Sequence, residues 1–162
     1  MFSELIVIDD PTPRAGPLNM AIDEVLLTTA RPAILRFYRW NAPWVSFGYF
    51  VRFAEAREIG IAAVLTETKA PKLSDVCFAN PVVSDVIESG HKIAGAAQRK
   101  THSGLLHQGS IQRGNLDERF RNAFAQLLGQ RIVEDRIEAG VLHAAEELAT
   151  TKYATVDWLR RR

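Results

Sequence analysis

The single cysteine of the chain, Cys77, is a residue whose type allows covalent chemistry. Lysines precede it and Asn80-Pro81 follows it, which favours a loop over a core strand. A nearby positive charge lowers the pKa of a thiol toward neutral pH, and Lys92 could supply that charge if its strand folds back. Free cysteine is also often a small buried hydrophobe. The sequence therefore offers Cys77 either as a nucleophile or as a core residue.

A lysine followed by small residues forms a second candidate site. The segment from Lys92 to Gln98 carries Gly95, Ala96 and Ala97, and nearly bare backbone lets a substrate or a phosphate approach closely. Such a segment suits an anion or acyl-carbonyl site with the lysine as its cation. A lysine beside a hairpin turn is also often merely solvated, and the chain has no Walker-type glycine-rich loop.

Three histidines, His91, His102 and His107, raise the question of a metal. Their spacings match no zinc pattern, and only one cysteine is available to complete a site. We therefore predict no metal site, and we expect His107 to be a hydrogen-bonded structural histidine on a strand.

Length and charge restrict the class of protein. A chain of 162 residues predicts one domain, and a net charge of +1 gives no electrostatic case for a nucleic-acid or membrane partner. No apolar run approaches the roughly 20 residues of a membrane helix, and the N-terminal residues lack the pattern of a signal peptide. One cysteine excludes an intramolecular disulfide. We expect a cytoplasmic protein.

Hydrophobic periodicity and turn residues predict the elements that position these groups. Predicted strands cover 5–8, 33–40, 44–50, 61–66, 82–88, 92–98 and 105–112, with a hairpin turn at Ser89-Gly90 and loops at 68–74 and 99–103. Predicted helices cover 17–30, 54–59, a stripe from Leu116 to Leu128 behind an Asn115–Glu118 capping box, 137–148, and a last turn near 153–159. Strands first and helices later favour an α+β domain with a mainly antiparallel sheet.

Two arginines interrupt an apolar, aromatic-rich stretch between residues 33 and 50. Arg36 and Arg39 are predicted to pair with Asp23 or Glu24 of the first helix. Most of the aromatic residues here are expected to form the core of the sheet, and some could line an apolar tunnel for a fatty or lipoyl chain.

Several segments together resemble the biotin/lipoate protein ligase and octanoyl/lipoyl transferase family. They are GPLNMAIDE at 16–24, LRFYRW at 35–40, VSFGY at 45–49, and the ordered group of Cys77-Phe78, KIAGAAQ at 92–98 and LLHQGSI at 105–111. The resemblance spans most of residues 18–112, and the order and spacing of the last group are its most specific part.

The resemblance implies a fold and an activity. The family fold is a mixed sheet flanked by helices, related to class II aminoacyl-tRNA synthetases and biotin ligases. Its members attach lipoate or octanoate to a lysine of a lipoyl domain or of glycine-cleavage protein H. The family's binding lysine falls on Lys92, which would contact the acyl carbonyl and the phosphate. One transferase branch forms an acyl-thioester on the cysteine of a Cys-Phe motif, which Cys77-Phe78 matches.

The matching segments also suggest substrate-binding residues, with Gly95 and Ala97 making room for the acyl carbonyl. The full set is Arg36, Trp40, Gly48, Tyr49, Asn80, Gly95, Ala97, His107 and Gly109.

The chain departs from the family at one place. The family carries an Arg-Arg-x-Thr-Gly-Gly-Gly segment that holds the adenylate and the acyl group, and this chain has none. The junction falls near Val64-Leu65, as though an internal block were absent, so the resemblance implies a shortened version of the fold.

Three functional hypotheses follow. The first is transfer of an octanoyl or lipoyl group to a lipoyl-domain lysine through a Cys77 thioester, with Lys92 as the activating cation and acyl carrier protein as a possible donor. The second is ATP-dependent lipoate ligation through lipoyl-AMP, which needs ATP and Mg²⁺ and no cysteine. The third is an inactive, minimised scaffold or lipoyl-domain-binding module. No covalently bound cofactor is expected under any of them.

Overall fold

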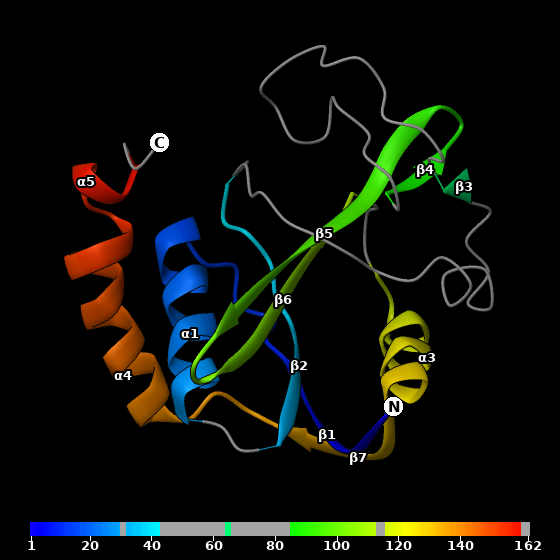
Figure 1. The fold of residues 1–162 in the computed structure, drawn as a ribbon, viewed down its shortest axis with the longest axis horizontal. Helices are drawn as coiled ribbons and strands as arrows, with labels where there is room; N and C mark the ends of the chain where they lie inside the picture. The colour runs from blue at the N-terminus through cyan, green and yellow to red at the C-terminus, as the bar shows by residue number, and fades with distance from the viewer. Residues whose placement is uncertain (30–31, 43–63, 66–84, 113–115, 160–162) are drawn as a thin grey trace. The chain divides into compact units, whose positions relative to one another are not determined.

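A computed structural model describes residues 1–29, 32–42, 64–65, 85–112 and 116–159 (Figure 1). The chain divides into two compact units. The first comprises Met1–Trp44, His102–Gly104 and Leu128–Arg162, and the second comprises Val45–Thr101 and Leu105–Leu127. The prediction of a single domain stays a prediction.

The first unit contains a parallel three-stranded sheet in the order β2-β1-β7 (Figure 1). Its strands are β1 (Phe2–Asp9), β2 (Ala33–Phe37) and β7 (Gly129–Asp135). The central strand β1 buries Leu5 and Ile8, which are 1% and 3% exposed. A strand paired on both edges satisfies its backbone groups, so its apolar side chains can enter the core.

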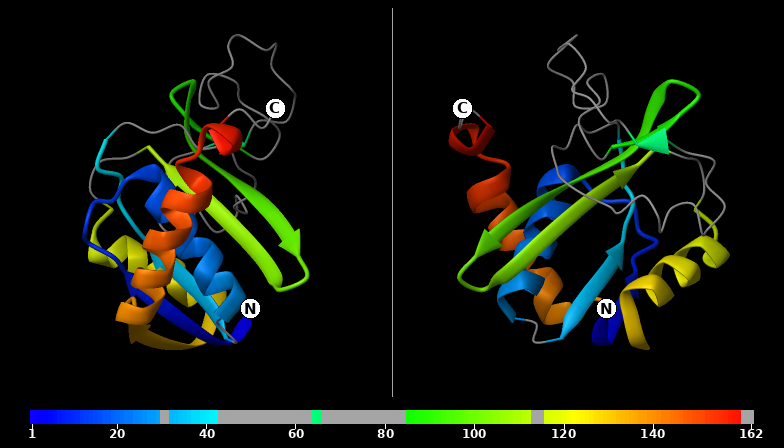
Figure 2. Two further views of the ribbon diagram at one scale, coloured as in Figure 1. Left: turned by 90° about the vertical axis from the view of Figure 1, so that its left-hand side faces the viewer. Right: turned by 45° about the vertical axis from the view of Figure 1, so that its right-hand side comes forward.

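Helices α1 (Gly16–Thr29) and α4 (Ala139–Leu148) contact each other in the same unit, as Figure 2 shows. A π-helical turn, η2 (Ala149–Tyr153), and a short helix, α5 (Val156–Leu159), continue from α4. Small residues on both helices build the core between them, which buries Ala21, Ile22, Ala145, Ala149 and Tyr153. Because small side chains let helix axes approach closely, α1 and the C-terminal helices form one layer.

The second unit contains a four-stranded sheet in the order β3-β4-β5-β6, followed by helix α3 (Glu118–Leu128). Its strands are β3 (Val64–Leu65), β4 (Val86–Glu88), β5 (His91–Thr101) and β6 (Gly104–Ile111). Val86, Ile93 and Ala94 are buried together, with Ile111 and Phe120 against them. The predicted stripe of α3 is present, with the rings of Phe120 and Phe124 stacked at 5.9 Å.

The predicted α+β fold, with mixed β-structure flanked by helices, is confirmed: β1 pairs in parallel with β2 and β7, and β4 pairs antiparallel with β3 and β5. The turn at Ser89-Gly90 is also confirmed. Both residues have positive φ, 50° and 79°, as a two-residue hairpin turn that follows the strand twist requires.

Several predicted boundaries were wrong. The expected loop over 99–103 is mostly strand, because β5 runs to Thr101 and only His102 and Ser103 separate it from β6. The expected strand over 33–40 ends at Phe37, and Trp40 instead forms an isolated parallel bridge with Arg14.

Strand β7 was missed altogether, because GQRIVED lacks a strong alternating pattern and most of its side chains are exposed. At the start of α3 the cap comes from Asp117, whose carboxylate accepts a hydrogen bond from the backbone N–H of Phe120 at 2.8 Å. Asn115, the expected first residue of the capping box, lies outside the described residues, as do the predicted strand 44–50, helix 54–59 and loop 68–74.

The pairing of β7 with β1 leaves no room for a side chain at Gly129. A Cβ there would lie 2.6 Å from Leu5 Cβ and 3.0 Å from Ile132 Cδ1. We expect Gly129→Ala to lower the free energy of unfolding by about 1–3 kcal/mol, because overpacking displaces the central strand. Urea unfolding measures this change.

Gly140→Ala is the matched control. Nothing lies within 4 Å of a Cβ at Gly140 in α4, so alanine should leave stability unchanged or raise it by up to about 1 kcal/mol. Equal effects of the two substitutions would contradict the close strand packing.

Candidate functional site

Lys92 is the best-defined of the predicted site residues. It is the second residue of β5, and its side chain is only 3% exposed. Its Nζ lies 2.8 Å from Oδ2 of Asp85, whose side chain is 5% exposed. A buried ammonium without a counter-charge is costly, and the Asp85 carboxylate supplies a counter-charge for Lys92. The alternative of a merely solvated lysine is wrong.

Gly95 lies directly beneath this ion pair. A Cβ at Gly95 would be 2.7 Å from Oδ1 of Asp85, 2.7 Å from Cε of Lys92 and 3.0 Å from its Nζ. The space that the sequence suggested for an acyl carbonyl is thus occupied here by the two paired side chains. Ala97, two residues further along β5, is half-buried.

A β-bulge accompanies the ion pair. Val86 of β4 pairs with Ala94, while the next residue, Ile87, pairs with Lys92, so β5 carries one extra residue, Ile93. The carbonyl of Ile93 accepts a hydrogen bond from the backbone N–H of Gln112 at 2.6 Å. Bulges change the direction of neighbouring side chains and are frequent beside active sites. Lys92, Ile93 and Ala94 are all buried, which a regular alternation would not allow for a sheet with one exposed face.

The far half of the β5–β6 hairpin is exposed. His107 on β6 shares a hydrogen bond with Gln98 on β5, with Nδ1 and Nε2 separated by 3.1 Å. Although the side chain is exposed overall, partial desolvation of the ring lowers the pKa of His107 below its usual range. The hydrogen bond with Gln98 agrees with the prediction that His107 is a hydrogen-bonded histidine on a strand. Gly109 lies against Ala96. A Cβ added at Gly109 would be 3.6 Å from the Cβ of Ala96, which is an ordinary contact.

Arg36 occupies a separate polar centre in the first unit. Its guanidinium donates to Oδ2 of Asp10 at 2.7 Å, to Oδ1 of Asp23 at 2.9 Å and to Oδ1 of Asn19 at 2.7 Å. It also lies 4.4 Å from the centre of the Tyr38 ring. The predicted pairing of Arg36 with Asp23 is confirmed. Because β2 supplies the arginine and α1 supplies two of its partners, this centre ties the helix to the sheet.

The electrostatics of this centre follow from burial and charge. Burial alone would raise the pKa of Asp10, but hydrogen bonds from Arg14 and Arg36 and their positive charges outweigh it and lower the pKa below its ordinary value of 3.8. Burial raises the pKa of Tyr38, the charge of Asp23 adds to the rise, and Arg36 partly offsets it. The centre therefore holds Asp10 as a carboxylate and Tyr38 as a neutral phenol.

Glu24 has a different partner from the expected arginine. Both of its carboxylate oxygens lie 2.6 Å from Nζ of Lys152, and the hydroxyl of Tyr153 donates to one of them. Lys152 also lies over the rings of Tyr153 and Trp158, at 5.1 and 5.2 Å from their centres. These contacts attach η2 and α5 to α1.

Four predicted site residues lie outside the described part of the chain. They are Cys77, Asn80, Gly48 and Tyr49. Of the remaining predicted residues, Lys92, Gly95, Ala97, His107 and Gly109 belong to the second unit, and Arg36 and Trp40 belong to the first. Trp40 contacts Tyr38 with ring centres 5.8 Å apart.

Sequence reasoning missed Asp85, the partner of Lys92. A single acidic residue directly before the apolar strand Val86–Glu88 was the available signal, but its partner six residues beyond Val86 becomes visible only once the hairpin is folded.

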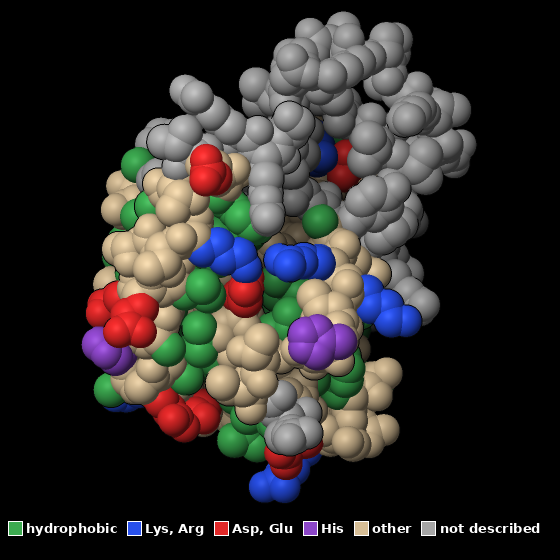
Figure 3. Space-filling model, turned by 60° about the vertical axis from the view of Figure 1, so that its left-hand side comes forward, with side chains coloured by type: hydrophobic (Ala, Val, Ile, Leu, Met, Phe, Trp, Pro, Cys, Tyr) green, Lys and Arg blue, Asp and Glu red, His purple; other side chains and the backbone are tan. Residues whose placement is uncertain are grey.

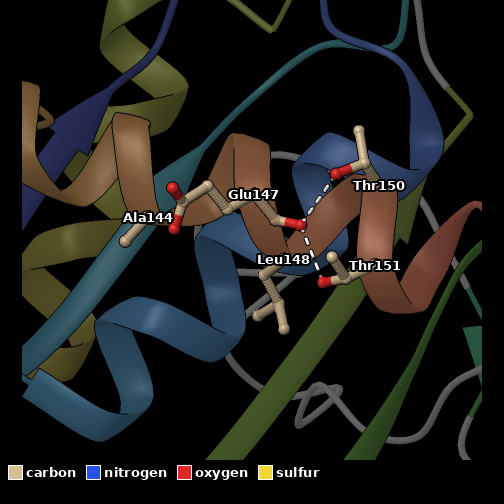
Figure 4. Close-up of a pocket in the computed structure, with 5 residues that line it drawn as sticks. All are labelled: Ala144, Glu147, Leu148, Thr150 and Thr151. Carbon is tan, nitrogen blue, oxygen red and sulfur yellow. Dashed lines mark hydrogen bonds between the residues drawn. The ribbon is translucent and has the colours of Figure 1, made fainter.

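Other surfaces of the described residues offer little chemistry. An open hollow of about 440 Å³ is lined by Ala144, Glu147, Leu148, Thr150 and Thr151 (Figure 4). Its two threonine hydroxyls donate to the carbonyl of Glu147, at 2.9 and 2.8 Å. Basic and acidic side chains both occur on the face shown in Figure 3, which agrees with the near-neutral net charge. Within the described ranges, no group of three His, Cys, Asp or Glu side chains could hold a metal ion, and no helix could cross a membrane.

Comparisons with characterised proteins bear on this arrangement. No family model matches the chain. It is 26% identical to octanoyltransferase LipM of Oceanobacillus iheyensis over 62% of this chain and 61% of that protein. Shorter matches reach 41% identity with LipM of Carboxydothermus hydrogenoformans, over 33% of this chain and 24% of that protein, and 56% with LipM of Symbiobacterium thermophilum, over 23% and 15%. The chain thus spans less than two thirds of the length of these relatives.

Solved structures of lipoate protein ligases share the fold. A Thermoplasma acidophilum protein described as a lipoate protein ligase superposes with a TM-score of 0.60, covering 98% of both chains at 19% identity. Lipoate-protein ligase A bound with ATP gives a TM-score of 0.56 with the same coverage and identity. The chain therefore has the fold of these lipoate protein ligases. The similarity to LipM proteins supports the family resemblance, and the fold class expected from the sequence is confirmed.

Gly95 and Gly109 allow a matched test of the buried ion pair. We expect Gly95→Ala to lower the free energy of unfolding by about 1–3 kcal/mol, because its Cβ would collide with Asp85 and Lys92. Gly109→Ala makes only ordinary contacts and should change stability by less than about 0.5 kcal/mol. Thermal and urea unfolding measure both, and a tolerated Gly95→Ala would contradict the placement of the pair.

Asp10→Asn tests the Arg36 centre. Removing one partner of a buried ion pair typically costs about 3–5 kcal/mol, and we expect the lower end because Asp23 remains. Since the pKa of Asp10 is lowered by folding, its stabilisation is present above pH 3.8 and is lost as the pH falls through its folded pKa. The difference between wild type and variant should therefore shrink in acid.

Urea unfolding from about pH 7 to about pH 3 measures this dependence. Glu4→Gln is the control, because its pair with Arg131 is exposed and such pairs contribute about 0–1 kcal/mol. A difference for Asp10→Asn that stays constant down to the acid end would show that its charge does not stabilise the fold.

Proposed function

We propose that this chain transfers an octanoyl or lipoyl group to a lysine of a lipoyl-domain protein. The observation that carries the proposal is the similarity to octanoyltransferases LipM, joined to a fold shared with lipoate protein ligases. One of these neighbours is a bipartite lipoate protein ligase from Thermoplasma acidophilum studied with its E2 lipoyl domain, at a TM-score of 0.53. That pairing supports a lipoyl domain as the acceptor.

Acylation is the first step of the proposed reaction. The thiolate of Cys77 attacks the carbonyl carbon of an acyl thioester on a carrier protein, the bond from that carbon to the carrier sulfur breaks, and the carrier leaves as a thiolate that takes up a proton from water. Lys92 donates a hydrogen bond from its ammonium to the carbonyl oxygen, which becomes negative in the tetrahedral intermediate. The burial of Lys92 supports this role, because a donor shielded from water stabilises an oxyanion more strongly.

Transfer to the acceptor is the second step. The neutral amine of a lipoyl-domain lysine attacks the thioester on Cys77, an amide bond forms, and the cysteine leaves as a thiolate while the amine loses its proton. The same ammonium of Lys92 stabilises the second oxyanion. Glycine-cleavage protein H presents the same chemical group and is a second possible acceptor.

ATP-dependent ligation is the alternative function, and the structural neighbour bound with ATP favours considering it. Lys92 would then contact the phosphate and acyl oxygen of lipoyl-AMP, and Cys77 would have no covalent role. The described residue that fits this chemistry is Lys92, the buried cation of β5. ATP and Mg²⁺ are needed only under this alternative.

Intact-mass spectrometry distinguishes the mechanisms. After incubation with octanoyl-carrier protein, we expect wild type to gain one octanoyl group and Cys77→Ala to gain none. Lys92→Met should form the adduct about 10²–10³-fold more slowly, as loss of one oxyanion donor does elsewhere. Glu4→Gln, which alters only an exposed ion pair, should match wild type.

Three other outcomes of these experiments would exclude one or both of the proposed mechanisms. An equal adduct on Cys77→Ala rules out the thioester mechanism. Formation of lipoyl-AMP from lipoate and ATP without a carrier donor favours ligation. Binding of a lipoyl domain without turnover by any donor leaves a binding module and contradicts both enzymatic proposals.

A further inference from the structure

We infer that Asp85 is a positioning residue for the transfer reaction: its carboxylate holds the Lys92 ammonium in one place and one direction. The inference rests on the proposed function, in which Lys92 contacts the acyl oxygen. Sequence patterns alone did not predict Asp85 as a site residue, and its role follows from the folded hairpin.

The first observation is the geometry of the pair. Oδ2 of Asp85 lies 2.8 Å from Nζ of Lys92, within the range of a charge-assisted hydrogen bond. An ammonium has three N–H donors on a tetrahedral nitrogen. Once one donor is directed at the carboxylate, the directions open to the other two are restricted.

The second observation is how tightly the pair is enclosed. The side chains of Lys92 and Asp85 are 3% and 5% exposed, and a methyl group added at Gly95 would lie 2.7 Å from both of them. Lysine has a long, flexible stem, so its ammonium is fixed only when an ion-pair partner holds it and neighbouring atoms pack closely around the stem. Because Gly95 has no side chain, the Lys92 stem can pack closely against its backbone.

The third observation is the origin of the negative charge. Residues 89–116 contain Lys92, Arg99, Lys100 and Arg113 but no aspartate or glutamate. The carboxylate of Asp85, the residue before β4, contacts Lys92 across the strand pair that the bulge distorts. The extra residue at Ile93 sets the stagger between the two strands at the site of the pair.

These observations favour positioning over a purely structural role. A buried ion pair adds little net stability compared with an apolar pair, because desolvation offsets its attraction. Asp85 stabilises Lys92 as a buried cation, and the proposed reaction uses that cation. Asp85 acts through Lys92 and is not assigned a contact with the substrate.

A double-mutant cycle tests the inference. We expect Asp85→Asn to lower kcat for octanoyl transfer by about 10²-fold with a smaller change in KM, because a misdirected donor loses mainly transition-state contact. In the Lys92→Met background, Asp85→Asn should cause little further loss. An equal fold-loss in both backgrounds would show that Asp85 does not act through Lys92 and would overturn the inference.

A second measurement does not depend on turnover. The protein is treated briefly with acetic anhydride and the modified lysines are mapped by peptide mass spectrometry. In wild type we expect Lys92 to be modified far less than the exposed Lys100, and in Asp85→Asn we expect its modification to rise at least several-fold while that of Lys100 stays constant. Unchanged modification of Lys92 in a folded variant would overturn the inference.

The two measurements separate the inference from the proposed function. If wild type transfers no acyl group but Asp85→Asn exposes Lys92, the proposed reaction fails and the control of Lys92 by Asp85 stands. If transfer is normal in Asp85→Asn, the positioning role fails and the reaction stands. Glu4→Gln again serves as the control for loss of one carboxylate, because it lies on an exposed ion pair.

Discussion

The burial of the Lys92 ammonium against Asp85 is the constraint on which the second unit depends. An isolated charge cannot remain in an apolar interior, so the strand that carries the lysine must lie beside the segment that carries the carboxylate. The bulge at Ile93 adjusts the stagger of the strands, and Gly95 leaves the space that the two side chains fill. Strand pairing, glycine placement and charge burial are therefore parts of one arrangement.

The first unit meets the same constraint in a different way. Arg36 is buried on β2, and the planar guanidinium has several donors, so it draws partners from two elements at once. Asp10 follows β1, while Asn19 and Asp23 come from α1. Fixing this arginine therefore joins the helix to the parallel sheet. Nε of Arg36 is buried without a hydrogen-bond partner in the described part of the chain.

A lysine held in this manner suits the acyl transfer proposed for this chain. A catalytic cation has to be present before substrate arrives, since a donor that must be reorganised during the reaction contributes less. The hairpin provides such preorganisation because Asp85 and Lys92 are only seven residues apart in the sequence. The two-residue turn at Ser89-Gly90 places β4, which follows Asp85, beside β5, which carries Lys92. Few other contacts are needed to keep the pair together.

The sequence alone determined the local elements and the family resemblance. Periodicity located α1, α3 and the hairpin, because amphipathic spacing and turn residues act over a few positions, and short motifs singled out Lys92. The sequence also predicted that Arg36 and Arg39 pair with Asp23 or Glu24, and the structure contains the pair of Arg36 with Asp23. Two features became clear only in the tertiary structure. They are the parallel strand β7, whose side chains are mostly exposed, and the carboxylate of Asp85 that pairs with Lys92. Side-chain partners depend on register and on a one-residue bulge, and no local preference specifies either of these.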